Sequence, residues 1–194
     1  AFRNTCKWLA DNGYMPVKEY TYKEISYWLG FNSTDMWNNF LPDSDIEIRE
    51  KARIMLGEDM ARRIENGEGA LFPNAEQVLA ELKKQKHTLI FLSNCRIKYM
   101  ERHSRVFGLD RFFDCCEEFD FIPKYQIFRL FSLQHNGQYI VIGDRFHDIE
   151  TAVKNGLKSI GCGYGYASDG ELKDADIIVS DITEIPQAVK KLIC

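Results

Sequence analysis

The sequence has no apolar run long enough to span a bilayer, and no basic segment followed by an apolar one. We therefore expect neither a membrane-spanning segment nor a signal peptide. Basic residues form no run either, and 25 Lys and Arg against 29 Asp and Glu give a formal net charge of −4. Such a charge gives no electrostatic basis for binding nucleic acid or an anionic membrane, so we expect neither as a partner.

The cysteines lack the spacings of a metal site or a redox motif. No C-x-x-C pair occurs, and no spacing matches a zinc site. Two of the six are adjacent and most lie in apolar segments, which favours reduced, buried thiols in a cytoplasmic protein. The six are Cys6, Cys95, Cys115, Cys116, Cys162 and Cys194.

Internal repeats and low-complexity segments are also absent, and the character of the chain changes near residues 67–69. With 194 residues it fits one medium domain, or a domain with a small insertion. Residues 1–66 read as helical, and aromatic residues at helical spacing, among them Trp8, Trp28 and Trp37, favour a packed core over a ligand pocket. We expect helices over residues 1–12, 21–29, 33–40 and 45–65, the last burying Ile46, Ile54, Met55, Met60 and Ile64.

From residue 69 onward, apolar strands alternate with helices. We predict strands over residues 88–92, 112–116, 138–142, 159–162 and 177–179, and helices over residues 74–85, 96–107, 125–135, 149–155 and 183–193. Such alternation is typical of a parallel sheet with helices on both faces. The predicted fold class is therefore α/β, with a Rossmann-like parallel sheet in residues 67–194 and a small all-helical domain in residues 1–66.

Polar side chains follow three of these strands. Ser93 and Asn94 follow the first, Lys124 precedes the helix after the second, and Asp144 follows the third, with Asp148 shortly after it. In open parallel sheets, ligands bind outside the carboxyl ends of the strands, where helix N-termini also favour anions. Two carboxylates gathered there are costly unless a cation or partner neutralises them. Mg²⁺ suits the place, because it usually takes one or two protein carboxylates together with a phosphate.

Each of these residues also has an ordinary structural interpretation. Ser93 is a suitable helix cap and Asn94 a suitable turn residue. Lys124 is of a type that usually lies solvated on the surface. An aspartate cap on the helix after the third strand, with Asp148 merely solvated, would account for the acidic pair. The joint arrangement is what favours a functional site over these separate explanations.

The same residues carry a resemblance to a known family. Phe91-Leu92-Ser93-Asn94, Lys124 and Gly143-Asp144-x-x-x-Asp148 keep the order and spacing of three motifs of the haloacid dehalogenase-like (HAD) hydrolase superfamily. Residues 71–82 and 161–178 resemble the phosphoglycolate phosphatase-like branch of that superfamily. The resemblance covers nearly the whole chain.

The resemblance implies a role for each matching residue. Ser93 would hydrogen-bond the transferring phosphoryl group, with the Asn94 backbone beside it. Lys124 would hold the phosphate and offset negative charge. Asp144 would ligate Mg²⁺ directly or through water, and Asp148 would support that metal site from close by. Residues 1–66 would form a helical cap over a HAD-like core.

Two departures from the family pattern stand out. In many relatives the lysine motif reads Lys-Pro-x-Pro, whereas this chain has Ile122-Pro123-Lys124-Tyr125. Other relatives place the lysine closer to the helix, which favours Lys124. The first motif of the family, an apolar strand ending Asp-x-Asp-x-Thr, is absent from the chain.

Two aspartate pairs come nearest to that first motif, but both lie in the wrong places. Asp43 and Asp45 have no strand before them, and Asp174 and Asp176 precede a strand instead of ending one. The absent strand is the central one of the family's sheet, and its loss would leave backbone groups unpaired in the core. We therefore expect the intact protein to have ten to twenty further residues before Ala1, on the order of one strand and its motif.

Together these features predict a Mg²⁺-dependent phosphatase that hydrolyses a small phosphorylated metabolite through an aspartyl-phosphate. Without the nucleophile, the printed chain would be inactive alone. Two alternatives stay open: a phosphosugar mutase of the same superfamily, and an inactive relative that only binds phosphate. Neither the substrate nor the oligomeric state follows from the sequence.

Overall fold

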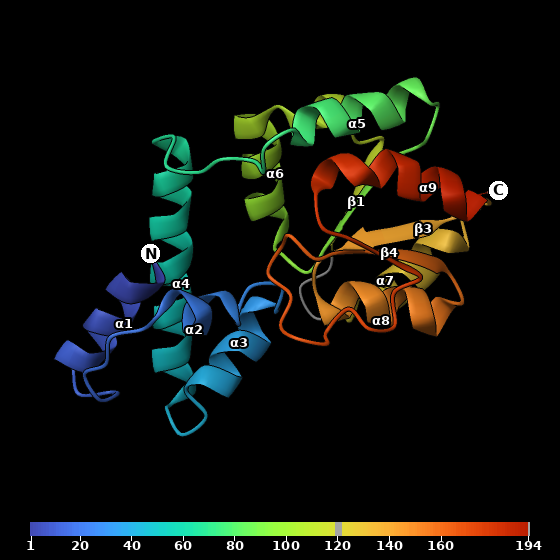
Figure 1. Ribbon diagram of the computed structural model, residues 1–194. Coiled ribbons are helices and arrows are strands. Elements are labelled where there is room, and N and C mark those ends of the chain that lie inside the picture. Colours follow the sequence, from blue (N-terminus) through green and yellow to red (C-terminus); the bar gives the residue numbers. More distant parts are fainter. Residues whose placement is uncertain (119–121, 194) are drawn as a thin grey trace. The chain divides into compact units, whose positions relative to one another are not determined.

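The computed structural model describes residues 1–118 and 122–193, without the side chains of residues 115–118. The chain divides into two compact units, residues 1–70 and residues 71–194 (Figure 1). The sequence predicts a division after residue 66, whereas the first unit extends to residue 70. No helix in the described part of the chain has the length and apolar character needed to cross a membrane.

The first unit is all helical. It comprises α1 (Phe2–Asp11), α2 (Tyr22–Ser26), α3 (Ser33–Phe40) and α4 (Ile46–Glu65). Local sequence sets two of the starts. Thr21 and Glu24 form a reciprocal capping box at α2, and the Asn32 side chain accepts a hydrogen bond from the Asp35 N–H at α3.

Aromatic packing fills the core of this unit, as the sequence predicts. Trp37 is 1% exposed, and the Phe2 ring stacks on it with centroids 6.3 Å apart. Trp8 and Trp28 pack against the same cluster. The tryptophans therefore stabilise the unit itself.

The buried positions predicted on α4 are wrong in part. Ile46 is 74% exposed and Ile54 is 44% exposed, whereas Ala52 is fully buried. Ile48 and Leu56 pack with Ala52 against the core. These residues are four apart, so they form one narrow stripe along the helix, and Ile46 and Ile54 lie off it.

The second unit alternates helices and strands, in agreement with the predicted α/β fold class. Its elements are α5 (Ala75–Lys84), β1 (Ile90–Ser93), α6 (Ile97–Phe107), η1 (Leu109–Arg111), β2 (Cys115–Glu118), α7 (Lys124–Ser132), β3 (Ile140–Gly143), α8 (Phe146–Asn155), β4 (Lys158–Cys162), β5 (Ile177–Val179), η2 (Ile182–Glu184) and α9 (Ile185–Ile193).

The strands form two parallel sheets. One pairs β1 with β2, with Ser93 opposite Glu118, and the other has the order β3-β4-β5, with Gly143 opposite Gly161. Among the described strands, β1 and β3 each pair on one side only. Every residue of β1 is half-buried, whereas β4 is buried beyond its first residue. Parallel strands are normally covered on both faces and flanked on both sides.

Helices cover both faces of the β3-β4-β5 sheet. Figure 1 shows α5 and α9 on one side of β3 and β4, and α7 and α8 on the other. The core between α5, α9 and the sheet is aliphatic, and its buried members are Val78, Leu82, Ile160, Cys162, Val179, Ile185, Ala188 and Val189.

One helix boundary differs from the prediction in a way that matters for the site. Helix α8 begins at Phe146, not near residue 149. The Asp148 carboxylate accepts a hydrogen bond from the Arg145 N–H at 3.0 Å, which stabilises the first turn and extends the helix toward β3. Asp148 therefore lies within the first turn of α8 instead of before the helix.

Burial agrees with the prediction for two of the three cysteine side chains that the structure describes. Cys6, Cys95 and Cys162 are free, and Cys6 and Cys162 are buried. Burial raises the pKa of the Cys6 thiol to about 12 and that of Cys162 to about 11, so both are neutral thiols near pH 7. The side chains of Cys115, Cys116 and Cys194 lie outside the described residues.

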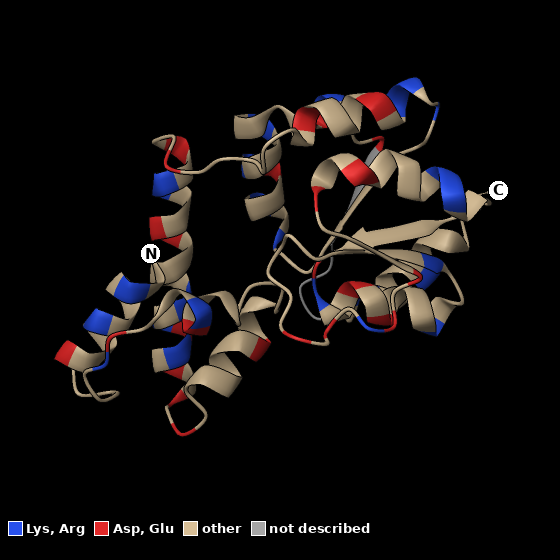
Figure 2. Ribbon diagram, in the orientation of Figure 1, with Lys and Arg blue, Asp and Glu red and all other residues tan. Residues whose placement is uncertain are grey.

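Figure 2 shows residues of both charge signs on α4, α5 and α6.

Candidate active site

The segments that follow β2 and β3 meet at one place. Lys124, the first residue of α7, donates to Asp148 in the first turn of α8 at 2.6 Å. Helices α7 and α8 pack along each other, and α7 also contacts β1 and β2. This contact brings the carboxyl ends of the two sheets toward a common region, where ligands bind in parallel α/β folds.

The Lys124–Asp148 ion pair is largely removed from solvent. The side chains are 13% and 10% exposed. One oxygen of Asp148 accepts from the lysine and the other from the Arg145 N–H. Burying two charges costs free energy that good geometry and additional hydrogen bonds offset, and both oxygens of Asp148 have such partners. Lys124 is therefore not the solvated surface lysine of the ordinary interpretation.

Asp144 lies beside this pair, and its pKa is raised. Burial raises its pKa, and the negative charge of Asp148 raises it further, while a hydrogen bond from the Tyr166 N–H at 2.7 Å opposes both effects. A neighbouring cation favours the ionised form of such a carboxylate. His147 has a lowered pKa, first because it is buried and then because Lys124 is positively charged.

Two glycines allow the backbone to approach these carboxylates. A Cβ atom on Gly143 would lie 2.1 Å from the Asp148 Cγ, and one on Gly165 would lie 2.4 Å from the Asp144 Cβ. Any other residue would overlap the aspartate side chain at either position. The loop after β4 therefore lies in direct contact with Asp144.

A buried ion pair not predicted from the sequence borders the same region. The Arg145 Nε donates to Glu171 at 2.8 Å, and the two side chains are 5% and 9% exposed. The Phe146 N–H donates to the same glutamate oxygen, and the Ser168 N–H to the other. In the sequence, Arg145 is a basic residue between two acidic ones, and Glu171 belongs to a distant loop. No local pattern pairs them.

Ser93 and Asn94 lie at the end of β1. The Ser93 hydroxyl accepts a hydrogen bond from the Cys95 N–H at 3.2 Å, which is the local turn contact of the ordinary interpretation. Helix α7 contacts β1, so Ser93 and Lys124 lie on neighbouring elements. That Ser93, Asn94 and Lys124 bind one phosphate stays a prediction.

The carboxylates at the site suit the expected Mg²⁺ better than other metals. In residues 1–118 and 122–193, no group of three or more His, Cys, Asp or Glu side chains is placed to hold a metal ion. The site offers the carboxylates of Asp144 and Asp148. Two carboxylates fit Mg²⁺, which completes its octahedron with waters and substrate phosphate, and they do not fit zinc or calcium, which take more protein ligands.

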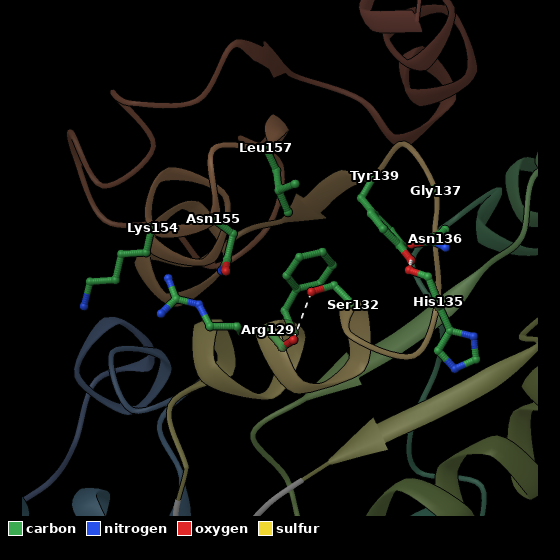
Figure 3. A pocket seen from close by; sticks show the side chains of 10 residues that line it. Arg129, Ser132, His135, Asn136, Gly137, Tyr139, Lys154, Asn155 and Leu157 are labelled. Carbon is green, nitrogen blue, oxygen red and sulfur yellow. Dashed lines mark hydrogen bonds between the residues drawn. The ribbon is translucent and has the colours of Figure 1, made fainter.

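A separate pocket of about 400 Å³ lies at the other end of β3 (Figure 3). Tyr139, just before β3, lines it and donates to the His135 carbonyl at 2.5 Å. The other lining residues come from the second half of α7, the loop after it and the end of α8: Phe128, Arg129, Ser132, Asn136, Gly137, Lys154, Asn155 and Leu157. Ligands of parallel sheets bind at the carboxyl ends of the strands, whereas this pocket lies at the amino end of β3. The candidate site is therefore at the strand ends marked by Ser93 and Gly143.

Comparison with protein families gives one clear match. The model described as "Haloacid dehalogenase-like hydrolase" matches residues 5–162. A 5'-nucleotidase of Pseudomonas aeruginosa is 31% identical over 114 residues, which are 55% of this chain and 51% of the relative. The chain thus spans about half the length of that curated relative.

Solved structures show the same fold at low identity. A predicted phosphatase from Clostridium acetobutylicum has a TM-score of 0.80 at 22% identity, over 98% of this chain and 91% of the other. CbbY from Rhodobacter sphaeroides, solved in complex with phosphate, has a TM-score of 0.74 at 20% identity, over 95% and 88% of the two chains.

Proposed function

Because the chain belongs to the haloacid dehalogenase-like hydrolase family, we propose that the protein hydrolyses a small phosphorylated metabolite in a Mg²⁺-dependent reaction. The observation that carries this proposal is the buried Lys124–Asp148 pair beside Asp144. A cation and two carboxylates at strand ends supply the charges that a phosphate and its metal require. The 5'-nucleotidase among the similar proteins supports the same class of reaction, and the predicted phosphatase shares the fold.

The residues would divide the work as follows. Asp144 would hold Mg²⁺, with Asp148 close by, and the ion would supply positive charge to the phosphoryl oxygens. Lys124 would bind the phosphate from the opposite direction, and its pairing with Asp148 fixes the ammonium in place. The Ser93 hydroxyl and the Asn94 N–H would hydrogen-bond the phosphate at the end of β1. Residues 1–70 would act as a cap that selects the leaving group.

We further propose that the nucleophile is an aspartate on a strand seated between β1 and β3. Each of these strands pairs on one side only among the described residues, and both are half-buried over most of their length. A parallel strand there would satisfy the backbone groups of both neighbours. Its carboxyl end would place an aspartate between Ser93 and Asp144, where it could form the aspartyl-phosphate.

The two aspartate pairs that come nearest to the first motif of the family are poor candidates for the nucleophile. Asp45 is the N-cap residue of α4, and Asp176 accepts from Lys158 and from the Ser159 N–H before β5. Neither ends a strand. Without a nucleophilic aspartate, the same site would bind phosphate without hydrolysing it, which is the second candidate function.

Phosphate release from an aryl phosphate tests the proposal. The full-length protein should turn over with Mg²⁺ and stop when the metal is chelated. Asp144→Asn should lower the rate more than about a hundredfold, beyond the loss typical of outer partners of a metal site. Asp174→Asn, a change of an exposed aspartate, is the matched control and should keep full activity. Full activity of Asp144→Asn would remove that residue from the site, and phosphate binding without release would favour the second candidate.

A further inference from the structure

Glu171 joins two segments that are far apart in the sequence. One oxygen accepts from the Arg145 Nε at 2.8 Å and from the Phe146 N–H at 2.6 Å. The other accepts from the Ser168 N–H at 2.7 Å. The carboxylate therefore ties the first turn of α8 to the loop after β4, and it uses both oxygens to do so.

The chemistry of this contact favours a positional role over a purely stabilising one. Burial opposes ionisation of Glu171, but hydrogen bonds from two backbone N–H groups and from Arg145 outweigh it and lower the pKa. The pair is thus charged and buried. Replacing a buried ion pair with apolar side chains of similar volume often leaves a protein equally stable or more stable. The property that the ion pair adds here is therefore fixed geometry.

Both segments contact the candidate metal ligands. In the loop, the Tyr166 N–H donates to Asp144 at 2.7 Å, and Gly165 lies against the same side chain. In the first turn of α8, the Arg145 N–H donates to Asp148 at 3.0 Å. The residues that Glu171 holds are therefore the same as, or within two residues of, those whose backbone N–H groups orient the two aspartates.

We propose that Arg145 and Glu171 are positioning residues that hold the loop over residues 163–168 and the first turn of α8, so that Asp144 and Asp148 face one cation. This inference rests on the proposed function, because it assigns the cation site to those aspartates. In this proposal neither residue is a ligand of the cation or the phosphate. Each acts through a backbone N–H that fixes a carboxylate, as the outer partners of metal ligands do.

Glu171→Gln is the main test, because glutamine keeps the shape of the side chain but loses its charge and replaces one acceptor oxygen with a donor. Mn²⁺ binding measured by electron paramagnetic resonance should weaken about tenfold or more. Amide hydrogen exchange of residues 163–168 should speed up, while exchange in α9 should not change. Arg145→Lys, which keeps the charge but not the guanidinium geometry, should weaken Mn²⁺ binding in the same direction.

Asp176→Asn is the matched control. Asp176 also accepts from a basic side chain, Lys158, and from a backbone N–H, that of Ser159. That pair lies at the amino ends of β4 and β5, away from the candidate site. Asp176→Asn should leave Mn²⁺ affinity and loop exchange unchanged. Unchanged Mn²⁺ affinity and loop exchange in both Glu171→Gln and Arg145→Lys would overturn the proposal.

The failure of this inference and the failure of the proposed function give different results. If Asp144→Asn abolishes Mn²⁺ binding and phosphate release but the Glu171 and Arg145 variants do not affect them, only the positioning role is wrong. If Asp144→Asn binds Mn²⁺ as well as the unmodified protein, the cation site itself is wrong. Exchange of the α9 amides reports whether each variant is folded, so a misfolded protein is not counted as either outcome.

Discussion

Gly165 shows how strictly the site constrains a single residue. The loop after β4 reaches Asp144 only because Gly165 has no side chain, and a Cβ there would lie 2.4 Å from the Asp144 Cβ. The backbone at Gly165 needs no left-handed conformation, since its φ is not among the positive values. Close approach is therefore the reason for this glycine.

Gly165→Ala should displace the loop, destabilise the protein by about 1–3 kcal/mol and reduce phosphatase activity. Gly57→Ala is the control, because Gly57 lies on α4 with nothing within 4 Å of its added Cβ. That change should raise the free energy of unfolding by about 0.5–1 kcal/mol. Denaturant unfolding and phosphate release measure both effects, and an unchanged rate in Gly165→Ala would contradict the close contact.

Some residues of the site could be predicted from the sequence and others could not. Asp144 and Asp148 lie four residues apart directly after an apolar strand, and Lys124 precedes a helix, so local pattern is enough to propose them as site residues. The Arg145–Glu171 pair joins residues on either side of β4. Its partners are set by how the loop folds back over α8, which no short pattern encodes.

At the scale of elements, a buried ion pair links the first turns of α7 and α8, and the Asn155 side chain also donates to the Tyr125 carbonyl. Lys124→Met should leave the Asp148 carboxylate without its cation and cost about 3 kcal/mol or more, because an unpaired buried charge is costly. Adding Asp148→Asn should recover most of that loss, since asparagine is neutral and still accepts from the Arg145 N–H. The double variant should be stable but inactive.

Denaturant unfolding of the two variants, with phosphate release from the same samples, measures this coupling. Equal stability of the single and double variants would show that the pair carries no coupling free energy. Activity in the double variant would exclude Lys124 and Asp148 from the reaction.

Element boundaries and helix faces show the limits of pattern reading. The stripe of Ile48, Ala52 and Leu56 packs against the core of the first unit, and the small Ala52 side chain is its centre. The large apolar residues predict burial of Ile46 and Ile54 instead, because a buried alanine contributes little to the hydropathy pattern. Helix α8 starts early because the Asp148 side chain stabilises its first turn.

At the scale of the whole molecule, the tryptophans lie in one unit only. Trp8, Trp28 and Trp37 belong to residues 1–70, so tryptophan fluorescence reports the unfolding of that unit. Far-ultraviolet circular dichroism reports both units. Mg²⁺ with phosphate should raise the unfolding midpoint of the second unit, because both bind only its folded state. The midpoint measured by tryptophan fluorescence should not change. A ligand-induced shift of the fluorescence midpoint equal to that of the dichroism would contradict a ligand effect confined to the second unit.

The strand pairing of β1 and β3 has a consequence for handling the polypeptide. Among the described residues each of these strands pairs on one side only, so its other side can accept a further extended segment. Molecules of the printed chain purified by themselves should therefore adhere edge to edge, and their light scattering should rise with concentration. A short synthetic peptide of strand-forming sequence, added in excess, should occupy those sides and keep the solution clear.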